Sequence, residues 1–557
     1  MVDKKIQDII IISLLALLLF VPFLGGVHLF DWDEINFAES AREMIQSHNY
    51  LTVQINYMPF WEKPPLFIWM QVLSMKVFGI NEFAARFPNA IAGMFTLVSI
   101  YLIGNRLFNR RFGWLWVLVY AGSILPQMYF RSGIIDPWFN FFIFMGIYFM
   151  VLSLHSYPAP KQNGYTFLSA AFIGLAIMTK GPVGLLIFLL TLFVWLLVAR
   201  RQWKRVFNAR FLIIYTVTLI VVGGFWFILQ AFNGKGYLIM DFIQYQIRLF
   251  SKKDAGHGGF LMYHFVVLFL GVFPASVYSL PAFRKFKDHR VIQNLFRNWM
   301  MISFWVVLIL FTIVKTKIVH YSSFCYFPLT FLAAYAIMNM IEGKLKYRGW
   351  VKFLLLLTAF VEGLVFVVLQ IFVTYKDQII AKGWIKDPFA LGNLQAKVHW
   401  SGWEFLPGVL LFFGILFFVI VYRKKIATQV VGIFVVTLVF TTVSIYTITP
   451  KIEKYSQNAA IEFYKSHDTE NCYLLVWGYK SYAQYFYGEI KQENTVTKSN
   501  EQRLLKGIVQ KPVYVITKNF EAEKFQKEYP DFKLLYRKNG FVFFGRPAGT
   551  FNEKIND

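Results

Sequence analysis

Apolar runs long enough to cross a membrane recur along most of this 557-residue chain. A helix needs roughly 17 to 25 mostly apolar residues to span the hydrocarbon core of a bilayer. Thirteen such runs are centred on residues 9–27, 88–104, 113–130, 137–154, 165–179, 183–199, 211–230, 262–280, 299–314, 319–340, 353–374, 404–422 and 428–447. With 57% hydrophobic and 19% aromatic residues, the composition excludes a water-soluble globular protein of this length. The sequence therefore predicts an all-α polytopic membrane region of about thirteen transmembrane helices.

The formal net charge of +25 is informative mainly through its distribution. With the N-terminus in the cytoplasm, the strong basic clusters fall in the loops that start near residues 106, 200, 284, 344 and 423, all on the cytoplasmic side. The loop at 375–403, with four lysines, is the main exception. This pattern predicts topology rather than nucleic-acid binding. Lys4 and Lys5 precede the first run without a small-residue cleavage site, so we expect an uncleaved first transmembrane helix rather than a removed signal peptide.

This topology leaves a long polar segment, residues 30–66, on the external side, directly after the first run. Asp31 and Glu34 have the spacing of a capping box, which predicts a helix from about residue 31 to 47 lying on a surface. The segment ends in Trp61-Glu62-Lys63-Pro64-Pro65, where the first proline favours extended geometry at Lys63. Two readings stay open: the charges complement a helix terminus and the lysine snorkels, or they form a site.

Other polar residues also fall mostly on the external side. They include Arg131, Asp136, Lys180, the loop 231–261, and Lys315 with Lys317. This enrichment favours chemistry at the outer face. Glu362 lies near the middle of a run, where a carboxylate is either functional or paired with a neighbouring helix.

After Pro450 the composition changes to short β-branched and aromatic runs at 473–477, 513–516 and 541–544, separated by polar stretches such as 519–529. This alternation predicts a small external α/β domain at 450–557, without a phosphate-binding glycine motif. The membrane domain then covers 1–449, with external juxtamembrane helices at about 31–78. Two cysteines, Cys325 and Cys472, do not support a disulfide framework.

Several motifs, taken in order, resemble one family. They are Asp33-Glu34, Ala38-Glu39, Arg42-Glu43-Met44, Glu62-Lys63-Pro64, Ile135-Asp136-Pro137, Met178-Thr179-Lys180-Gly181, His257 in a long external loop, and Lys317 with Tyr321. Over roughly the first 340 residues they resemble the polyprenyl-phosphate-dependent glycosyltransferases that include the lipid A aminoarabinose transferases. More distantly they resemble the protein O-mannosyltransferases.

The resemblance implies an inverting transferase of the type C glycosyltransferase fold, with a lipid-phosphate sugar as donor and an active site facing the periplasm. It implies catalytic roles for Asp33, Glu34 and Asp136. Donor phosphate would be bound by Lys63, Lys317, Tyr321 and Lys180, because fixed cations stabilise the charge that develops on a phosphate leaving group. Glu62 and His257 would share a divalent cation, and no organic cofactor is expected.

The acceptor is open at this stage. Lipid A is favoured by the aminoarabinose branch, and a protein or another glycan is the alternative within the enzyme class. With a hydroxyl acceptor, Asp33 must act as general base, whereas an ionised phosphate acceptor needs only orientation. A lipid-linked sugar flippase is the rival from another class, and it predicts charges facing each other at the membrane midplane and paired repeats. Apart from Glu362 the runs are nearly free of charge, which favours the enzyme.

Overall fold

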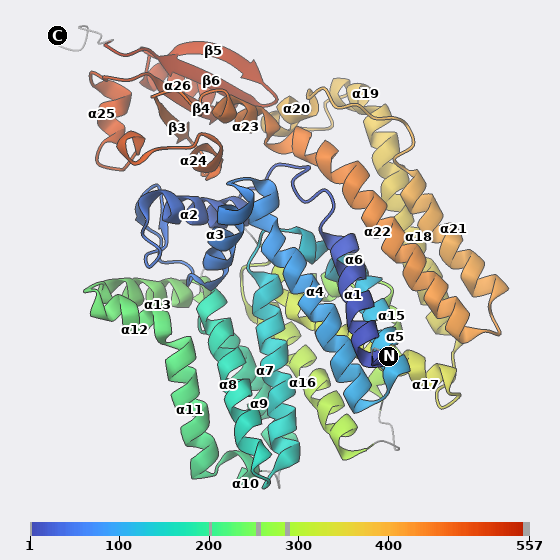
Figure 1. Cartoon of the computed structure of the whole chain (residues 1–557). Helices are drawn as coiled ribbons and strands as arrows, with labels where there is room; N and C mark the ends of the chain where they lie inside the picture. Colours follow the sequence, from blue (N-terminus) through green and yellow to red (C-terminus); the bar gives the residue numbers. More distant parts are fainter. Residues whose placement is uncertain (1–2, 200–202, 252–257, 285–289, 550–557) are drawn as a thin grey trace.

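The computed structural model describes residues 3–199, 203–251, 258–284 and 290–549. Long helices run side by side through the lower part of Figure 1, and a smaller region with strands lies above one end of them. The helices of the larger part are α1 (Lys4–Phe20), α4 (Glu82–Leu107), α5 (Arg110–Ala121), α6 (Ile124–Met128), α7 (Asp136–Ser156), α8 (Lys161–Lys180), α9 (Val183–Val198), α10 (Trp203–Val206), α11 (Ala209–Gly223), α12 (Phe225–Phe232), α14 (Tyr263–Gly271), α15 (Ala275–Ser279), α16 (Val291–Ile313), α17 (Tyr326–Ile341), α18 (Gly349–Thr374), α21 (Leu406–Val421) and α22 (Ile426–Ser456), with 3-10 helices η1 (Tyr129–Arg131), η2 (Leu280–Phe283) and η3 (Val319–Cys325).

Each of the thirteen predicted apolar runs coincides with one helix or with two or three consecutive ones. In the described part of the chain, six helices are long and apolar enough to cross a membrane, or up to eight if two bent pairs each form one span. The chain bends by 57° between α11 and α12, and by 104° where α14 meets the segment Ala275–Phe283. The second bend contains Pro274, which cannot continue a helical hydrogen-bond ladder. A multi-pass helical protein is therefore observed, and the count of thirteen spans stays a prediction.

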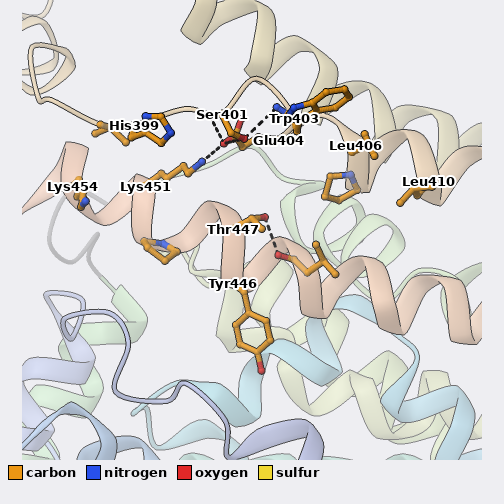
Figure 2. Close-up of a pocket in the computed structure, with 14 residues that line it drawn as sticks. His399, Ser401, Trp403, Glu404, Leu406, Leu410, Tyr446, Thr447, Lys451 and Lys454 are labelled. Atoms are coloured by element: carbon orange, nitrogen blue, oxygen red, sulfur yellow. Dashed lines mark hydrogen bonds and ion pairs between the residues drawn. The ribbon is translucent and has the colours of Figure 1, made fainter.

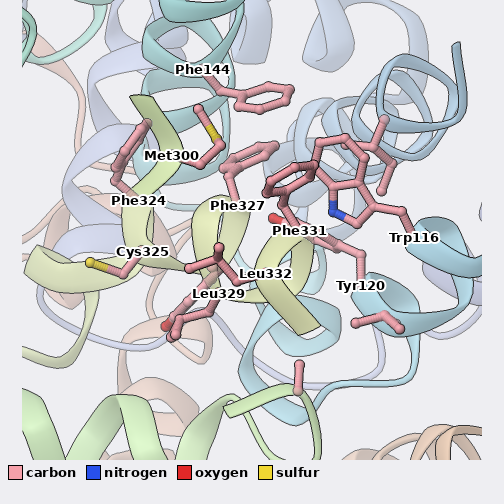
Figure 3. Close-up of a cluster of buried hydrophobic side chains, with 14 of the residues drawn as sticks. Trp116, Tyr120, Phe144, Met300, Phe324, Cys325, Phe327, Leu329, Phe331 and Leu332 are labelled. Carbon is pink, nitrogen blue, oxygen red and sulfur yellow. The ribbon is translucent and has the colours of Figure 1, made fainter. Parts of the chain in front are cut away.

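Aromatic side chains fill the core between α5, α7 and α17 (Figure 3). The Trp116 and Phe331 rings lie 5.2 Å apart edge to face, and Phe144 stacks on Phe327 at 4.3 Å. The buried indole N–H of Trp116 donates to Thr330 at 3.2 Å, so its polar group is satisfied. Since α17 continues directly from η3, this core fixes the position of the η3 residues at the upper end of the bundle.

The upper end of the bundle carries α2 (Asp33–Ser47), α3 (Leu66–Phe78), α13 (Gly236–Ser251), and a two-stranded hairpin of β1 (Gln54–Ile55) and β2 (Met58–Pro59) (Figure 1). The helices α19 (Lys376–Ala381) and α20 (Pro388–Leu394) lie near the same end. The start of α2 near residue 31 and its end at Ser47 agree with the sequence prediction.

The C-terminal region, which we define as residues 458–549, contains one mixed sheet with the strand order β3-β4-β6-β5. Strands β3 (Tyr473–Trp477) and β4 (Val513–Lys518) are parallel, whereas β6 (Phe541–Arg546) pairs antiparallel with β4 and with β5 (Lys533–Lys538). The region also has α23 (Asn458–Lys465), α24 (Ala483–Tyr487), η4 (Gln492–Asn494), α25 (Glu501–Lys506) and α26 (Ala522–Glu528). Strands occupy the three predicted positions, and the exposed edge strand β5 was not predicted. The division of the chain at residue 450 stays a prediction, and α22 runs through that position.

Two sequence predictions about α2 are wrong. Its N-cap is Trp32 and no side chain caps it. Asp31 binds Ser481, and Glu34 binds Arg86 and the Phe30 N–H, so the two carboxylates do not form a capping box. Nor does α2 lie on a surface: eleven consecutive residues from Glu34 to Met44 are buried. The C-terminal region covers α2, and residues 29–85 share one hydrophobic cluster with residues 459–543.

Candidate functional site

A cavity of about 590 Å³ opens at the upper end of the bundle, where α2, the turn at Glu62-Lys63, α7, α8, α13 and η3 meet. It gathers most of the residues that sequence motifs singled out. The titratable residues in its lining are Asp31, Asp33, Glu34, Glu62, Lys63, Asp136, Lys180, Tyr245, Arg248, His320, Tyr321 and Lys480. The sequence motifs therefore contain most of the charged residues that line this cavity, although Asp31, Tyr245, Arg248, His320 and Lys480 were not chosen as site residues.

Asp33 is the first residue of α2 and reaches into the cavity. Its carboxylate Oδ2 lies 3.4 Å from Nε2 of His320, and its side chain keeps 34% exposure. His320 stands between the two motif residues Lys317 and Tyr321, so its position in that polar segment was the available signal. A half-exposed carboxylate beside an imidazole is an arrangement suited to taking up a proton from, or orienting, a bound hydroxyl.

Lys63 lines the same cavity, half-buried in the turn before α3. Its ammonium lies 5.3 Å from the centroid of the Tyr245 ring on α13. Burial lowers the pKa of Lys63, and the carboxylates of Glu62 and Asp33 oppose that shift. Asp33 and Lys63 thus converge on one cavity, as the motifs predicted, and each feels the charge of the other.

Asp136 and Lys180 form an ion pair with 2.6 Å between Oδ1 and Nζ. Asp136 begins α7 and Lys180 ends α8, so each charge complements the partial charge of its own helix terminus. The Lys180 ammonium also lies 5.4 Å from the Tyr321 ring and 5.6 Å from the Phe139 ring. The break after Lys180 is made by Gly181 at φ +91°, where a residue with a Cβ is strained.

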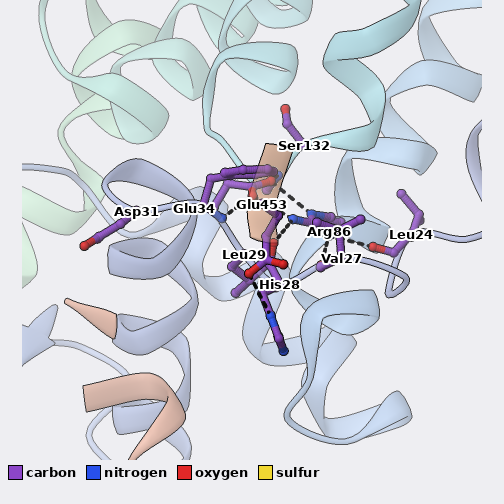
Figure 4. Close-up of polar contacts among 12 residues, drawn as sticks. Leu24, Val27, His28, Leu29, Asp31, Glu34, Arg86, Ser132 and Glu453 are labelled. Atoms are coloured by element: carbon purple, nitrogen blue, oxygen red, sulfur yellow. Dashed lines mark hydrogen bonds and ion pairs between the residues drawn. The ribbon is translucent and has the colours of Figure 1, made fainter. Parts of the chain in front are cut away.

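Glu34 faces the cavity, but its two carboxylate oxygens are taken by other groups (Figure 4). Arg86 donates to them from Nε at 3.1 Å and Nη2 at 2.8 Å, and the backbone N–H groups of Phe30 and Gly133 donate at 2.9 and 2.5 Å. Burial alone would raise the pKa of Glu34, but the guanidinium and the N–H donors hold it below its ordinary value. This geometry makes Glu34 a support for the residues around it, and its predicted catalytic role stays untested.

Glu62 accepts a hydrogen bond from the Tyr245 hydroxyl at 2.9 Å. Its predicted metal partner, His257, lies outside the described residues. Among residues 3–199, 203–251, 258–284 and 290–549, no group of three or more histidines, cysteines, aspartates or glutamates could hold a metal ion. The divalent cation therefore stays a prediction.

Lys317 is placed differently from the other predicted phosphate ligands. Its ammonium donates to the carbonyls of Phe311 and Thr312 at 2.9 and 2.6 Å, near the end of α16. The side chain is 7% exposed and is not part of the cavity lining. A lysine that binds the last carbonyls of a helix stabilises that terminus, so the structure gives this ammonium a support role beside Tyr321.

A second cavity of about 520 Å³ lies between the segment 398–407 and α22 (Figure 2). Its most buried charge, Glu404, accepts from Ser401 and forms an ion pair with Lys451. Burial would raise the pKa of Glu404, but the ammonium and the Ser401 donors lower it to about 2. Because its one carboxylate is already paired with Lys451 and no motif residue lines it, this cavity is the weaker candidate for chemistry.

Comparison with known proteins agrees with the motif resemblance. A family model described as dolichyl-phosphate-mannose-protein mannosyltransferase matches residues 62–227. The chain is 25% identical over 348 residues to an undecaprenyl phosphate-alpha-4-amino-4-deoxy-L-arabinose arabinosyl transferase of Shewanella sediminis. It is 27% identical over 359 residues to the protein of the same name from Edwardsiella ictaluri. These matches span 62% and 63% of this chain, and 62% and 64% of the relatives' own length.

The fold is shared along almost the whole chain with a solved structure, ArnT from Cupriavidus metallidurans bound to undecaprenyl phosphate. The TM-score is 0.76 with 18% sequence identity, covering 98% of this chain and 99% of that one. The apo structure of the same protein gives a TM-score of 0.75. The resemblance derived from the motifs is thus confirmed, and the chain is similar in fold and in part of its sequence to the polyprenyl-phosphate-dependent glycosyltransferases of the aminoarabinose type.

Proposed function

We propose that this protein is an inverting membrane glycosyltransferase that moves a sugar from a polyprenyl phosphate to lipid A. The observation that carries the proposal is the convergence of Asp33 and Lys63 on one cavity, in a fold shared with a protein solved with undecaprenyl phosphate. A half-exposed carboxylate and a partly desolvated ammonium are the two opposite charges that such a transfer needs.

The chemistry follows from the two charges. An acceptor oxygen attacks the anomeric carbon, the bond from that carbon to the phosphate oxygen breaks, and polyprenyl phosphate leaves with the bonding electrons. Lys63 stabilises the charge that grows on this phosphate, and partial burial strengthens the interaction. The leaving group departs from the face opposite to the attacking oxygen, which inverts the configuration at the anomeric carbon.

Asp33 acts on the acceptor. If the acceptor oxygen belongs to a hydroxyl, Asp33 removes its proton, and His320 at 3.4 Å helps to hold the carboxylate. If it belongs to an ionised phosphate, no proton moves and Asp33 orients the acceptor. The Asp136–Lys180 pair and Tyr321 line the donor side and position the phosphate beside Lys63.

The proposed location is the cell inner membrane, with the cavity facing the periplasm. Three of the basic loops meet at one place, around Asn109, Arg290 and Lys344, which is consistent with a single cytoplasmic end. The C-terminal region and α2 lie at the opposite end of the bundle from α10, another of the basic positions (Figure 1). The active site and the C-terminal region are then external.

A protein acceptor is the second candidate, and one observation favours it: the family model that matches residues 62–227 describes a protein mannosyltransferase. Mass spectrometry of lipid A and of glycoproteins from cells with and without this protein separates the two. The lipid A proposal expects a pentose-sized or hexose-sized addition on lipid A alone. Additions confined to proteins would replace lipid A as the acceptor.

The site is tested with Asp33→Asn and Lys63→Ala in the same assay. Each variant should lose most transfer, about a hundredfold or more, because each removes a charge that acts in the transition state. Matched controls are Asp377→Asn, an exposed aspartate in the first turn of α19, and Lys76→Ala, whose ammonium lies 4.4 Å from the Tyr50 ring. Near-normal turnover in either site variant, with unchanged protein levels in the membrane, would contradict the assignment.

A further inference from the structure

One lysine of the cavity comes from the C-terminal region. Strand β3 ends at Trp477, and the chain turns at Gly478, φ +79°, to bring Lys480 to the lining of the cavity. Binding residues commonly follow the carboxyl ends of parallel strands, and β3 is in the parallel pair of this sheet. The C-terminal region therefore completes the wall of a cavity that is otherwise made by the membrane part.

Asp31, which precedes α2, fixes the loop that carries Lys480 to the N-terminal part of the chain. The Asp31 carboxylate accepts from the Ser481 hydroxyl at 2.5 Å and from the Tyr482 N–H at 3.3 Å. The Tyr482 ring also packs edge to face on Trp32 with centroids 5.3 Å apart. These contacts hold the loop in place before any ligand binds, which lowers the entropy cost of binding.

The ammonium of Lys480 lies over two aromatic rings, 4.3 Å from the centroid of Trp32 and 5.3 Å from that of Tyr482. Its side chain is exposed to the cavity mouth, and within the described residues it forms no ion pair with a carboxylate. The nearby Asp31 carboxylate is engaged by Ser481 and Tyr482. The Asp31 carboxylate is close enough to interact electrostatically with this ammonium but forms no ion pair with it. An ammonium positioned by aromatic rings and not held in an ion pair is suited to bind an anion from solution or from a ligand.

The position of the Lys480 ammonium relative to Asp33 indicates whether it binds the donor or the acceptor. Asp33 interacts electrostatically with Asp31, beside Lys480, and with Lys63. In an inverting displacement the acceptor and the leaving phosphate lie on opposite faces of the sugar, and the carboxylate that handles the acceptor lies on the acceptor's face. Lys480 lies near Asp31, which is a neighbour of that carboxylate. With Lys63 on the leaving phosphate, Lys480 is on the acceptor side.

We propose that Lys480 binds an anionic group of the acceptor, a phosphate close to the attacking oxygen, and so selects a phosphorylated glycolipid. The proposal rests on the proposed function, which places the donor phosphate at Lys63. It assigns the C-terminal region a direct part in acceptor recognition rather than a covering role alone.

Binding to the full-length protein in detergent tests the proposal without turnover. The probes are phosphorylated lipid A, the same glycolipid after removal of its phosphates, and undecaprenyl phosphate. The wild type should bind the phosphorylated form about tenfold more tightly than the dephosphorylated form, a ratio equivalent to about 1.4 kcal/mol. In Lys480→Gln this preference should disappear, while the affinity for undecaprenyl phosphate stays unchanged.

Two variants serve as controls. Lys480→Arg keeps the charge and should keep the preference. Lys524→Gln removes an exposed lysine of the same region, whose ammonium lies 5.5 Å from the Trp477 ring but which does not line the cavity, and it should behave as wild type. A wild type that binds both glycolipids equally, or a Lys480→Gln variant that loses undecaprenyl phosphate instead, would overturn the proposal.

Turnover is measured separately with the same variants. Lys480→Gln should raise KM for the phosphorylated acceptor about tenfold, the ratio expected from its lost binding, and leave kcat and the KM of the donor unchanged. If the wild type transfers no sugar although the binding preference is present and depends on Lys480, the proposed function fails and the anion site stands. If transfer is normal and insensitive to Lys480, the inference fails and the proposed function stands.

Discussion

Replacing Arg86 with methionine should destabilise the fold more than any change at an exposed ion pair. Arg86 is 5% exposed and donates to Glu34 and to three backbone carbonyls, those of Leu24 at 2.8 Å, Val27 at 2.7 Å and His28 at 3.0 Å (Figure 4). One side chain thus ties α4 to the end of the first helix and to the start of α2. Methionine replaces the apolar stem of the side chain but lacks the guanidinium and donates nothing.

The magnitude follows from what the substitution leaves behind. The Glu34 carboxylate keeps only the two backbone donors at Phe30 and Gly133 and loses its counter-charge inside the protein. Removing one partner of a buried ion pair costs about 3–5 kcal/mol, because the other charge stays buried. The contacts to the Val27 and His28 carbonyls are only partly buried, so water replaces part of the lost donors there, and we expect about 4 kcal/mol in total.

The double variant Glu34→Gln with Arg86→Met separates this cause from a loss of packing. It removes both charges, so it should recover about 1–3 kcal/mol relative to Arg86→Met alone, the size of coupling found between contacting residues. The matched control is Lys344→Met, which breaks an ion pair whose side chains are 57% and 39% exposed and should cost less than about 1 kcal/mol.

The assay is thermal unfolding of the purified protein in one detergent, followed by tryptophan fluorescence at one scan rate. Equal scan rates matter because large proteins often unfold irreversibly. The order of midpoints should be wild type, then Lys344→Met close to it, then the double variant, then Arg86→Met. An Arg86→Met protein as stable as Lys344→Met, or a double variant no better than the single one, would refute the reasoning.

Three further predictions concern neighbouring features. Burial and the charge of Glu39 raise the pKa of Glu43 above its ordinary value, so the folded state holds a proton that the unfolded state releases. The stability of the fold should therefore decrease as the pH rises from about 5 to about 9. In the same unfolding assay, Glu43→Gln should make the stability less dependent on pH. Gly181→Ala should lower the unfolding midpoint, because its φ of +91° strains alanine and the added Cβ would lie 2.5 Å from the Phe242 ring. Asp136→Asn should raise the KM for the donor more than the KM for the acceptor, because Lys180 loses the partner that positions it. Initial-rate kinetics with each substrate varied in turn measure both values, and a larger effect on the KM for the acceptor would contradict the prediction.

The local part of the site was predictable from sequence. Asp33 and Lys63 lie in one polar segment between two apolar runs, so a short stretch of chain had to bring them to the same membrane surface. Asp136 and Lys180 were predictable for the same reason, because each stands at the terminus of an apolar helix on one side of the membrane.

The long-range partners were not predictable. Arg86 lies 52 residues after Glu34, and Ser481 lies 450 residues after Asp31. A capping box is the favoured use of Asp31 and Glu34 when only local backbone donors are considered. In the folded protein, a guanidinium and the loop after β3 offer stronger or better placed donors, and the carboxylates bind those instead. Lys480 was missed for the same reason, because nothing near it in sequence connects it with the first external segment.

The four carboxylates of α2 differ in what their surroundings leave them free to do. Glu34 is held by a guanidinium and two N–H groups, Glu39 accepts two charge-assisted hydrogen bonds from the arginine three residues later, and Glu43 accepts two N–H groups of the β1–β2 turn. Asp33 lies 3.4 Å from one imidazole, and its side chain is the most exposed of the four. A helix rich in buried acids is costly unless each acid is satisfied, so the one acid left partly open, opposite the ammonium of Lys63, is the carboxylate of α2 that is free for the chemistry proposed above.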